Sequence, residues 1–228
     1  MSNQAKERVG RYAADYVEDG MVVGLGTGST AYYFVDELAR RLQAGQLNHI
    51  TAVTTSKQTA RQAESLGIPL VPLDDVNAID LVVDGADEAT TSFNGIKGGG
   101  GALLHEKIVA TYSHRVIWIV TQEKMVETLG RFPLPIEVVP FGSWKLFYKL
   151  EAAGMRPQFR KSDRDSLFIT DSGNYIIDLH LERIDNPHQL QFDLNNMVGV
   201  VETGLFLDHP HTILIGQDDE TIKIHTRE

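Results

Sequence analysis

The 228-residue sequence contains no cysteine. Disulfide bonds, thiolate metal ligands and cysteine nucleophiles are therefore excluded together, and the absence is typical of a protein that works in the reducing cytoplasm. Long hydrophobic runs are also missing, and the N-terminal stretch is charged and amphipathic rather than apolar. Because a transmembrane helix needs about 20 apolar residues, we expect a cytoplasmic protein with no membrane partner.

Positive charge is in short supply: 21 Lys and Arg residues stand against 31 Asp and Glu, which gives a net charge of -10. Charge of this sign repels nucleic acid at long range, so we expect no nucleic-acid partner. An anionic small molecule can still bind if backbone amides and one or two lysines overcome the overall field locally. The rest of the composition, with 42% hydrophobic and 23% charged residues, indicates a folded globular protein.

The first half of the chain alternates short β-branched runs with helical patterns. The pattern predicts strands at residues 21–26, 50–55, 68–73, 78–85 and 116–121, and helices at 30–42, 57–66 and 102–113. Strand and helix repeated in this way indicate an α/β fold, with a Rossmann-like, mostly parallel sheet covered on both faces. Ligands of such sheets bind at the carboxyl ends of the strands. We therefore expect the site in the loops that follow the strands.

The order of strand and helix patterns in the sequence changes after residue 132. Strand patterns at residues 136–139, 156–160, 175–181 and 200–206 alternate with helical patterns at 144–154 and 188–199. This βαββαβ order is the split-βαβ arrangement and predicts a second, smaller ferredoxin-like α+β domain at residues 133–206. Residues 1–132 and 207–228 would form the Rossmann-like catalytic domain, with the strand patterns near the C-terminus rejoining the first sheet.

Residues 24–30, Gly-Leu-Gly-Thr-Gly-Ser-Thr, follow a buried strand pattern and open a helix. Three glycines let the backbone turn tightly and approach a ligand, while Ser29 or Thr30 can cap the helix and aim free amides at an anion. The segment therefore predicts a phosphate-binding loop, and a purely structural tight turn is the alternative. It is a poor dinucleotide-binding motif because Ser29 stands where the third glycine belongs.

Asp84 and Asp87 follow an apolar strand pattern, so they are expected at the ligand-binding end of the sheet. The alternative is that both acids merely cap turns, a common use of Asp near glycine. Two carboxylates three residues apart could also hold a metal ion, but no histidine or third ligand accompanies them. We therefore expect no metal at this site.

Lys97 and four consecutive glycines lead into the helix that carries Glu106. Four glycines cost so much chain entropy that a backbone held close to a ligand or a strand is the economical interpretation. A carboxylate in the first turns of a helix is favoured by the dipole and held on a rigid element. Taken alone, Glu106 would be better interpreted as a solvated acid beside Lys107, and Lys124, which follows the fifth strand, as an ordinary surface lysine.

Two further sets of residues could suggest metal binding. Asp178, His180 and Glu182 would share one face of a strand, and His209 and His211 are two residues apart. Neither set has further ligands nearby, so both metal interpretations are weak. The side chains of Trp144, Phe147, Tyr148 and Leu150 are interpreted as the buried side of an amphipathic helix.

Taken together and in this order, GLGTGST, TTS, DGADE, KGGGGALLHEK and GRFPLPIEV resemble ribose-5-phosphate isomerase of type A. The resemblance continues through DSGNYIIDLH and VETGLF and so covers nearly the whole chain. Each motif is weak by itself, but the ordered set is specific. Two departures are small: Gly101 extends the glycine run beyond the three usual in the family, and His105 stands at a position that is often basic or polar.

The resemblance implies an aldose–ketose isomerase of the non-oxidative pentose phosphate pathway that interconverts D-ribose 5-phosphate and D-ribulose 5-phosphate through a cis-enediolate. It implies no metal or other cofactor, and a homo-oligomer, either a dimer or a tetramer. Glu106 would be the base, Asp84 would assist opening of the furanose ring, Asp87 would bind sugar hydroxyls, and Lys97 would complete the catalytic set. The implied substrate-binding residues are Thr27, Gly28, Ser29, Thr30, Asp84, Gly85, Ala86, Asp87, Lys97, Gly98, Gly99, Gly100 and Lys124.

The residue types agree with this chemistry, because removing a proton next to a carbonyl needs a positioned base and donors for the developing oxyanion.

Two other classes of function remain open. A non-catalytic sugar-phosphate sensor should carry a DNA-binding segment and need not keep the acids. A coenzyme A transferase or nicotinamide enzyme on a similar sheet is disfavoured because no acidic residue for a cofactor ribose ends the second strand.

Overall fold

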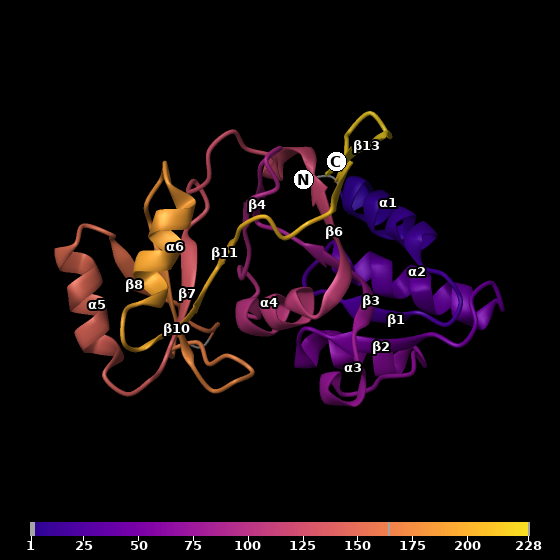
Figure 1. Ribbon diagram of the computed structural model, residues 1–228, viewed down its shortest axis with the longest axis horizontal. Helices are drawn as coiled ribbons and strands as arrows, with labels where there is room; N and C mark the ends of the chain where they lie inside the picture. The colour runs from indigo at the N-terminus through magenta and orange to yellow at the C-terminus, as the bar shows by residue number, and fades with distance from the viewer. Residues whose placement is uncertain (1–2, 164, 228) are drawn as a thin grey trace. The chain divides into compact units, whose positions relative to one another are not determined.

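The computed structural model describes residues 3–163 and 165–227. By their internal packing these residues form two compact units (Figure 1), the first made of Met1–Ala86, His105–Met125 and Asp208–Glu228, and the second of Asp87–Leu104 and Val126–Leu207. The domain boundaries expected from the sequence, at residues 133 and 206, stay a prediction. The compact units differ from them because residues 87–104 and 126–132 pack with the second unit.

The first unit is built on a six-stranded sheet in the order β13-β12-β6-β3-β1-β2. Its strands are β1 (Val22–Leu25), β2 (Thr51–Thr54), β3 (Ile79–Gly85), β6 (Ser113–Thr121), β12 (Thr212–Gly216) and β13 (Ile222–Thr226). The pairs β1–β2, β1–β3, β3–β6 and β6–β12 run parallel, and β13 pairs antiparallel with β12. The predicted Rossmann-like, mostly parallel sheet is confirmed, as is the return of the C-terminal strands to it.

Helices α1 (Asn3–Ala13), α2 (Ala31–Gln43) and α3 (Lys57–Ser65) pack on this sheet through one apolar core (Figure 1). Helix α4 (Leu103–Thr111) also packs on the sheet, since Val109 lies against Gly24 of β1. The core brings Val9 of α1 and Phe34 of α2 together with Leu81 of β3, all fully or almost fully buried. Short 3-10 turns complete the unit, namely η1 (Ala14–Tyr16), η2 (Leu73–Asp75) and η3 (Gln122–Lys124).

The prediction of a strand at residues 68–73 in this unit is wrong. Residues 68–73 form no named strand, and their pairing is reduced to an isolated bridge between Leu70 and Ala52. The physical reason is that Pro69 and Pro72 flank the bridge and lack the N–H groups that a continuous ladder needs. The apolar run satisfied the strand pattern, but the two prolines confine its hydrogen bonding to a single bridge.

The second unit contains a four-stranded antiparallel sheet in the order β10-β7-β9-β8. Along the chain its elements are β7 (Leu134–Val138), α5 (Ser143–Ala152), β8 (Pro157–Phe159), β9 (Tyr175–Leu179), α6 (Pro187–Asn195) and β10 (Val200–Thr203). Leu150 of α5 and Leu194 of α6 share one core with Ile136 and Ile177 of the strands. The predicted βαββαβ, ferredoxin-like fold is confirmed.

A second, three-stranded sheet in this unit was not expected. It consists of β4 (Glu88–Ala89), β5 (Gly95–Ile96) and β11 (Leu205–Phe206), in the order β11-β5-β4. Its strands have two residues each, too few to show an alternating pattern in the sequence. Asp87 directly precedes β4 and Lys97 directly follows β5, so this sheet fixes the backbone next to two residues that the sequence predicts for the site.

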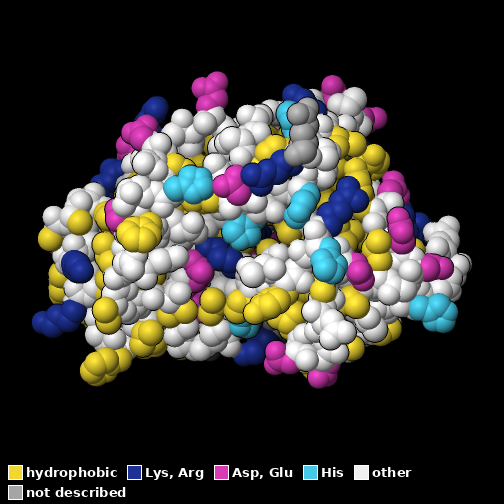
Figure 2. Space-filling model, in the orientation of Figure 1, with side chains coloured by type: hydrophobic (Ala, Val, Ile, Leu, Met, Phe, Trp, Pro, Cys, Tyr) yellow, Lys and Arg dark blue, Asp and Glu magenta, His cyan; other side chains and the backbone are white. Residues whose placement is uncertain are grey.

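Helix α5 corrects another expectation from the sequence. Leu150 is buried as expected, but Trp144 and Tyr148 are exposed rather than buried. Trp144 instead packs with its ring tilted against those of Phe147 and Phe159, whose centroids are 5.3 and 4.7 Å away. Figure 2 shows hydrophobic side chains at the surface over the α5 region.

Within the described residues, no helix has the length and apolar character that a membrane crossing needs.

Candidate active site

In the first unit, the loop after β1 closes around the carboxylate of Asp84. The backbone amide of Thr27 donates to Asp84 Oδ1 at 3.0 Å, and that of Gly85 donates to the same oxygen at 2.7 Å. Asp84 is buried, and a Cβ added to Gly26 would lie 2.2 Å from Asp84 Oδ1. Position 26 therefore has to be glycine if the loop is to approach the acid this closely.

Hydroxyl groups join this loop to the segment after β2. Thr27 Oγ1 lies 2.7 Å from Thr55 Oγ1 and donates to Ser56 Oγ at 2.8 Å. Thr59 Oγ1 donates to the carbonyl of Gly26 at 3.0 Å, and Ser56 caps α3 by accepting from the Thr59 amide at 3.1 Å. The side chain of Thr27 therefore fixes the loop's own conformation, which explains the TTS motif in physical terms.

The expectation that Ser29 or Thr30 caps helix α2 is wrong. Thr30 is at the N-cap position without a side-chain cap hydrogen bond, and Ser29 Oγ instead accepts from Lys6 Nζ at 3.0 Å. Gly28 and Ser29 are exposed, and Gly28 has a φ of 109° that favours glycine. A helix N-terminus with a lysine beside it suits an anion. Sequence reasoning missed Lys6, whose only signal was its place on the amphipathic N-terminal segment.

The burial of Glu106 and Lys107 decides between the two interpretations of Glu106 that the sequence leaves open. Both side chains are buried, at 5% and 8% exposure, so Glu106 is not a solvated acid on a helix face. Glu106 lies in the first turn of α4. Burial on a rigid element limits both the rotamers and the hydration of the carboxylate, which are the properties wanted of a positioned base.

Lys124 is not an ordinary surface lysine either. Its Nζ donates to the carbonyl of Ala86 at 2.6 Å, which links η3 to the segment that follows β3. Strands β3 and β6 are parallel neighbours, with Asp84 opposite Trp118, so their carboxyl ends lie at the same edge of the sheet. The first unit thus gathers Asp84, Gly85, Ala86 and Lys124 at the edge where the ligand was expected.

In the second unit, Asp87 and the glycine loop at residues 97–101 bind each other. The amide of Gly99 donates to Asp87 Oδ2 at 2.7 Å, and a Cβ on Gly99 would lie 2.7 Å from Asp87 Oδ1. Gly98, with a φ of 102°, packs with a similar tightness against Leu103. The loop therefore needs glycines because its backbone runs against side chains of its own unit, while Gly99 and Gly100 remain exposed.

Lys97 is buried at the start of this loop. Its amide donates to the carbonyl of Gly204 at 2.9 Å, and its Nζ lies 5.3 Å from the ring centroid of Phe206. Glu88 beside Asp87 has a structural role, since its carboxylate accepts from the amides of Gly130 and Phe132 at 2.8 and 2.7 Å. Of the acids in the DGADE motif, Asp84 and Asp87 thus remain as candidates for chemistry.

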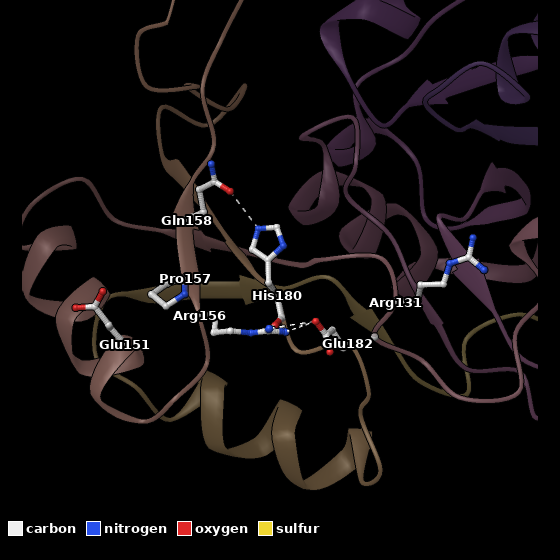
Figure 3. A pocket seen from close by; sticks show the side chains of 8 residues that line it. Arg131, Glu151, Arg156, Pro157, Gln158, His180 and Glu182 are labelled. Carbon is white, nitrogen blue, oxygen red and sulfur yellow. Dashed lines mark hydrogen bonds and ion pairs between the residues drawn. The ribbon is translucent and has the colours of Figure 1, made fainter.

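Two of the residues that suggested metal binding, His180 and Glu182, contact protein groups. Strand β9 ends at Leu179, so His180 and Glu182 do not continue the face of Asp178 as expected. Around the cavity of Figure 3, His180 Nε2 lies 3.2 Å from Gln158 Oε1, and Glu182 accepts from Arg156 at 3.1 Å. Over residues 3–163 and 165–227, no group of three or more His, Asp or Glu side chains is arranged to hold a metal ion.

Comparison with known proteins gives one consistent family. A sequence model described as ribose 5-phosphate isomerase A (phosphoriboisomerase A) matches residues 51–220. Ribose-5-phosphate isomerase A of Limosilactobacillus reuteri is 52% identical over 225 residues, 99% of both chains. That of Enterococcus faecalis is 54% identical over 220 residues, 96% of this chain and 97% of the other.

Solved structures agree. A D-ribose-5-phosphate isomerase in complex with phospho-erythronic acid is 38% identical, with a TM-score of 0.94 over 98% of both chains. Ribose 5-phosphate isomerase from Plasmodium falciparum is 34% identical, with a TM-score of 0.95 over 99% of both chains. With the motifs of the sequence found in place in the fold, the chain belongs to the ribose 5-phosphate isomerase A family.

Proposed function

We propose that this chain interconverts D-ribose 5-phosphate and D-ribulose 5-phosphate through a cis-enediolate, with Glu106 as the base. The observation that carries the assignment is that Glu106 is buried in the first turn of α4, directly after the glycine loop, in a chain of this family. A relative binds phospho-erythronic acid, which carries both a phosphate and a carboxylate. A site for such a molecule is suited to a phosphorylated substrate whose intermediate bears negative charge.

In the proposed reaction, the carboxylate of Glu106 takes the C2 proton of the open-chain aldose. The electron pair of the C2–H bond forms the C1–C2 double bond, and the carbonyl electrons move onto O1. The proton of the C2 hydroxyl passes to O1, and Glu106 returns its proton to C1, which leaves the ketone at C2. A base held out of bulk water loses little activity to solvation, and its carboxyl proton can exchange with solvent before Glu106 returns a proton to C1.

The other site residues receive supporting roles. Asp84, held by two loop amides, assists opening of the furanose ring, and Asp87 binds sugar hydroxyls. Lys97 stabilises the developing oxyanion with positive charge. The phosphate lies at the N-terminus of α2, and Lys6 adds a cation there. The remaining contacts to substrate come from Thr27, Gly28, Ser29, Thr30, Gly85, Ala86, Gly98, Gly99, Gly100 and Lys124.

The same proposal covers the setting of the reaction. The chain acts in the non-oxidative pentose phosphate pathway, in the cytoplasm, as a homo-oligomer that is a dimer or a tetramer. It uses neither a metal ion nor another cofactor, because a carboxylate base with lysine and amide donors accounts for every proton and charge in the reaction. These statements rest on family membership and on the residue types of the site.

Replacement of Glu106 by Gln tests the proposal. Gln keeps the shape but cannot accept the proton, so kcat should fall by about two to four orders of magnitude while the fold and KM persist. Glu64→Gln is the matched control, since Glu64 is an exposed helix acid on α3 and should tolerate the same change. In deuterium oxide, wild-type enzyme should place solvent deuterium in the product.

Two results would contradict the assignment. Near-normal turnover by Glu106→Gln would transfer the role of base to Asp84 or Asp87. Wild-type conversion with complete retention of the substrate hydrogen would indicate hydride transfer between C2 and C1 instead of an enediolate.

A further inference from the structure

We propose that Arg160 is a positioning residue for the glycine loop at residues 97–101. Held by Asp178, the guanidinium fixes the peptide groups of the loop and, through them, the carboxylate of Asp87. The catalytic part of this inference rests on the proposed isomerase function. The structural part concerns the second unit alone and can be tested without substrate.

The guanidinium of Arg160 lies between a carboxylate and two loop carbonyls. Its Nη1 donates to the carbonyl of Gly98 at 2.6 Å and to that of Gly99 at 3.0 Å. Its Nε donates to Asp178 Oδ2 at 2.9 Å, and its Nη2 donates to Asp178 Oδ1. The side chains of Arg160 and Asp178 are only 14% and 18% exposed, so the pair is shielded from water more than a surface ion pair.

One peptide group connects Arg160 to Asp87. The carbonyl of Gly98 and the amide of Gly99 belong to the same peptide, which is trans, so its oxygen and its N–H point in opposite directions. The oxygen accepts from Arg160, and the N–H donates to Asp87 Oδ2 at 2.7 Å. Hydrogen bonds on both sides of a peptide polarise it and strengthen one another. Arg160 therefore acts on Asp87 without touching it.

The same reasoning orients the next peptide. Because the carbonyl of Gly99 accepts from Arg160, the amide of Gly100 points away from the guanidinium. A run of glycines has wide conformational freedom, so its amides are fixed only where something outside the run holds them. Arg160 supplies that hold on the peptides of Gly98 and Gly99.

A second contact anchors the far end of the loop to the same segment. The carbonyl of Arg160 accepts from the amide of Phe168 at 2.9 Å, and a Cβ on Gly101 would lie 2.5 Å from the Phe168 ring. The amide of Arg160 donates to the carbonyl of Ile176 in β9 at 2.9 Å. The backbone of Arg160 is thus fixed to the sheet, and its neighbourhood holds the glycine loop at both ends.

Arginine suits this task better than lysine. Its planar fork presents donors on two edges at once, so one edge can bind a carboxylate bidentately while Nη1 reaches carbonyls on the other side. An ion pair that served stability alone would not need the two carbonyl contacts. Asp178, one residue before the end of β9 and one of the acids that suggested a metal ligand in the sequence, is explained by this pairing.

Kinetics of Arg160→Met test the inference, with Arg156→Met as the matched control. Arg156 belongs to the same unit and also binds a carboxylate, that of Glu182 at 3.0 Å, but at the surface. Because small misplacements of catalytic groups cost about 100-fold, we expect kcat for ribose 5-phosphate to fall about 10- to 100-fold in Arg160→Met. The KM should rise as well, because Asp87 is proposed to bind sugar hydroxyls, whereas Arg160→Lys should recover part of the loss and the control should stay within about twofold of wild type.

Amide hydrogen exchange of Gly99, measured by NMR without substrate, supplies the independent readout. Exchange at Gly99 should be at least about tenfold faster in Arg160→Met than in wild type, and unchanged in Arg156→Met. If wild-type protein fails to isomerise ribose 5-phosphate, the proposed function is wrong, and the exchange result alone decides whether Arg160 positions the loop. A folded Arg160→Met with wild-type exchange at Gly99 overturns the inference, whatever its melting temperature.

A double-mutant cycle with Asp87→Asn tests the route of the effect. If Arg160 acts through Asp87, adding Arg160→Met to Asp87→Asn should lower kcat by no more than about twofold. The same 10- to 100-fold loss in both backgrounds would overturn coupling through Asp87.

Discussion

Glu37 provides the most quantitative test of the structure. This acid on α2 is buried and accepts hydrogen bonds from three arginines: Arg40 Nη2 at 2.6 Å, Arg41 Nε at 2.9 Å and Arg11 Nη1 at 3.1 Å. The hydrogen bond from Arg40, with those from Arg41 and Arg11, lowers the pKa of Glu37 from 4.5 to about 2, against the opposing effect of burial. Since Arg11 lies on α1, the carboxylate also joins the two helices.

The expected magnitude follows from that pKa. The difference between 4.5 and about 2 corresponds to about 3 kcal/mol of stabilisation of the folded state. Arg40 is 54% exposed, so screening by water reduces the contribution, and we expect about 1–3 kcal/mol. Because the folded-state pKa of Glu37 is depressed, the stabilisation is complete above pH 4.5 and is lost as pH falls through about 2.

Urea unfolding of Glu37→Gln, followed by far-UV circular dichroism, measures the effect. At pH 7 the variant should be less stable than wild type by about 1–3 kcal/mol, and the difference should shrink as pH approaches 2. Asp36→Asn is the control, because Asp36 is a partly exposed neighbour that pairs with Arg11 at 3.2 Å and should change stability by under about 1 kcal/mol. An equal loss at pH 7 and pH 3 would refute the charge-based reasoning.

Three further changes probe the site. In Gly26→Ala, the new Cβ would lie 2.2 Å from Asp84 Oδ1, so the acid must move by about 1 Å, and kcat should fall about 100-fold in steady-state assays; normal turnover would show that the position of Asp84 is unimportant. Ser29→Ala with Thr30→Ala should chiefly raise KM and weaken competition by inorganic phosphate, whereas an unchanged KM would make the loop a structural turn. Dialysis against EDTA should leave the isomerase rate intact, and a loss restored by one specific metal would end the proposal of a cofactor-free reaction.

The elements that could be predicted from the sequence are those long enough to show a repeating spacing of apolar residues. Strands β1, β3 and β6 and helix α2 show repeating apolar positions, and the βαββαβ order of the second unit follows from elements of similar clarity. The two-residue strands β4, β5 and β11 have no period to read. The exposure of Trp144 and Tyr148 also could not be predicted, because an aromatic residue at helical spacing looks the same on either face.

The candidate site likewise contains residues that the sequence predicts and residues that only the structure identifies. Motifs identified Asp84, Asp87 and Glu106, because acids and glycines at strand ends are local signals. The groups that hold the motifs come from elsewhere in the chain: Lys6 reaches Ser29 across 23 residues, and Arg160 reaches Gly98 across 62. No local pattern links residues that far apart, so these contacts had to come from the folded structure.

Burial by itself does not identify the base, and the other buried glutamates show why. Glu37 accepts hydrogen bonds from three arginines, and Glu88 accepts from two backbone amides. Glu137 accepts from Thr170 and Asn174 at 2.8 and 2.9 Å. Each of these acids has a structural task that accounts for its place in the interior. Glu106 differs in its position, since it is the buried acid on the helix that follows the glycine loop, whose Gly99 amide donates to Asp87. The catalytic assignment therefore rests on burial and chain position together, and neither would carry it alone.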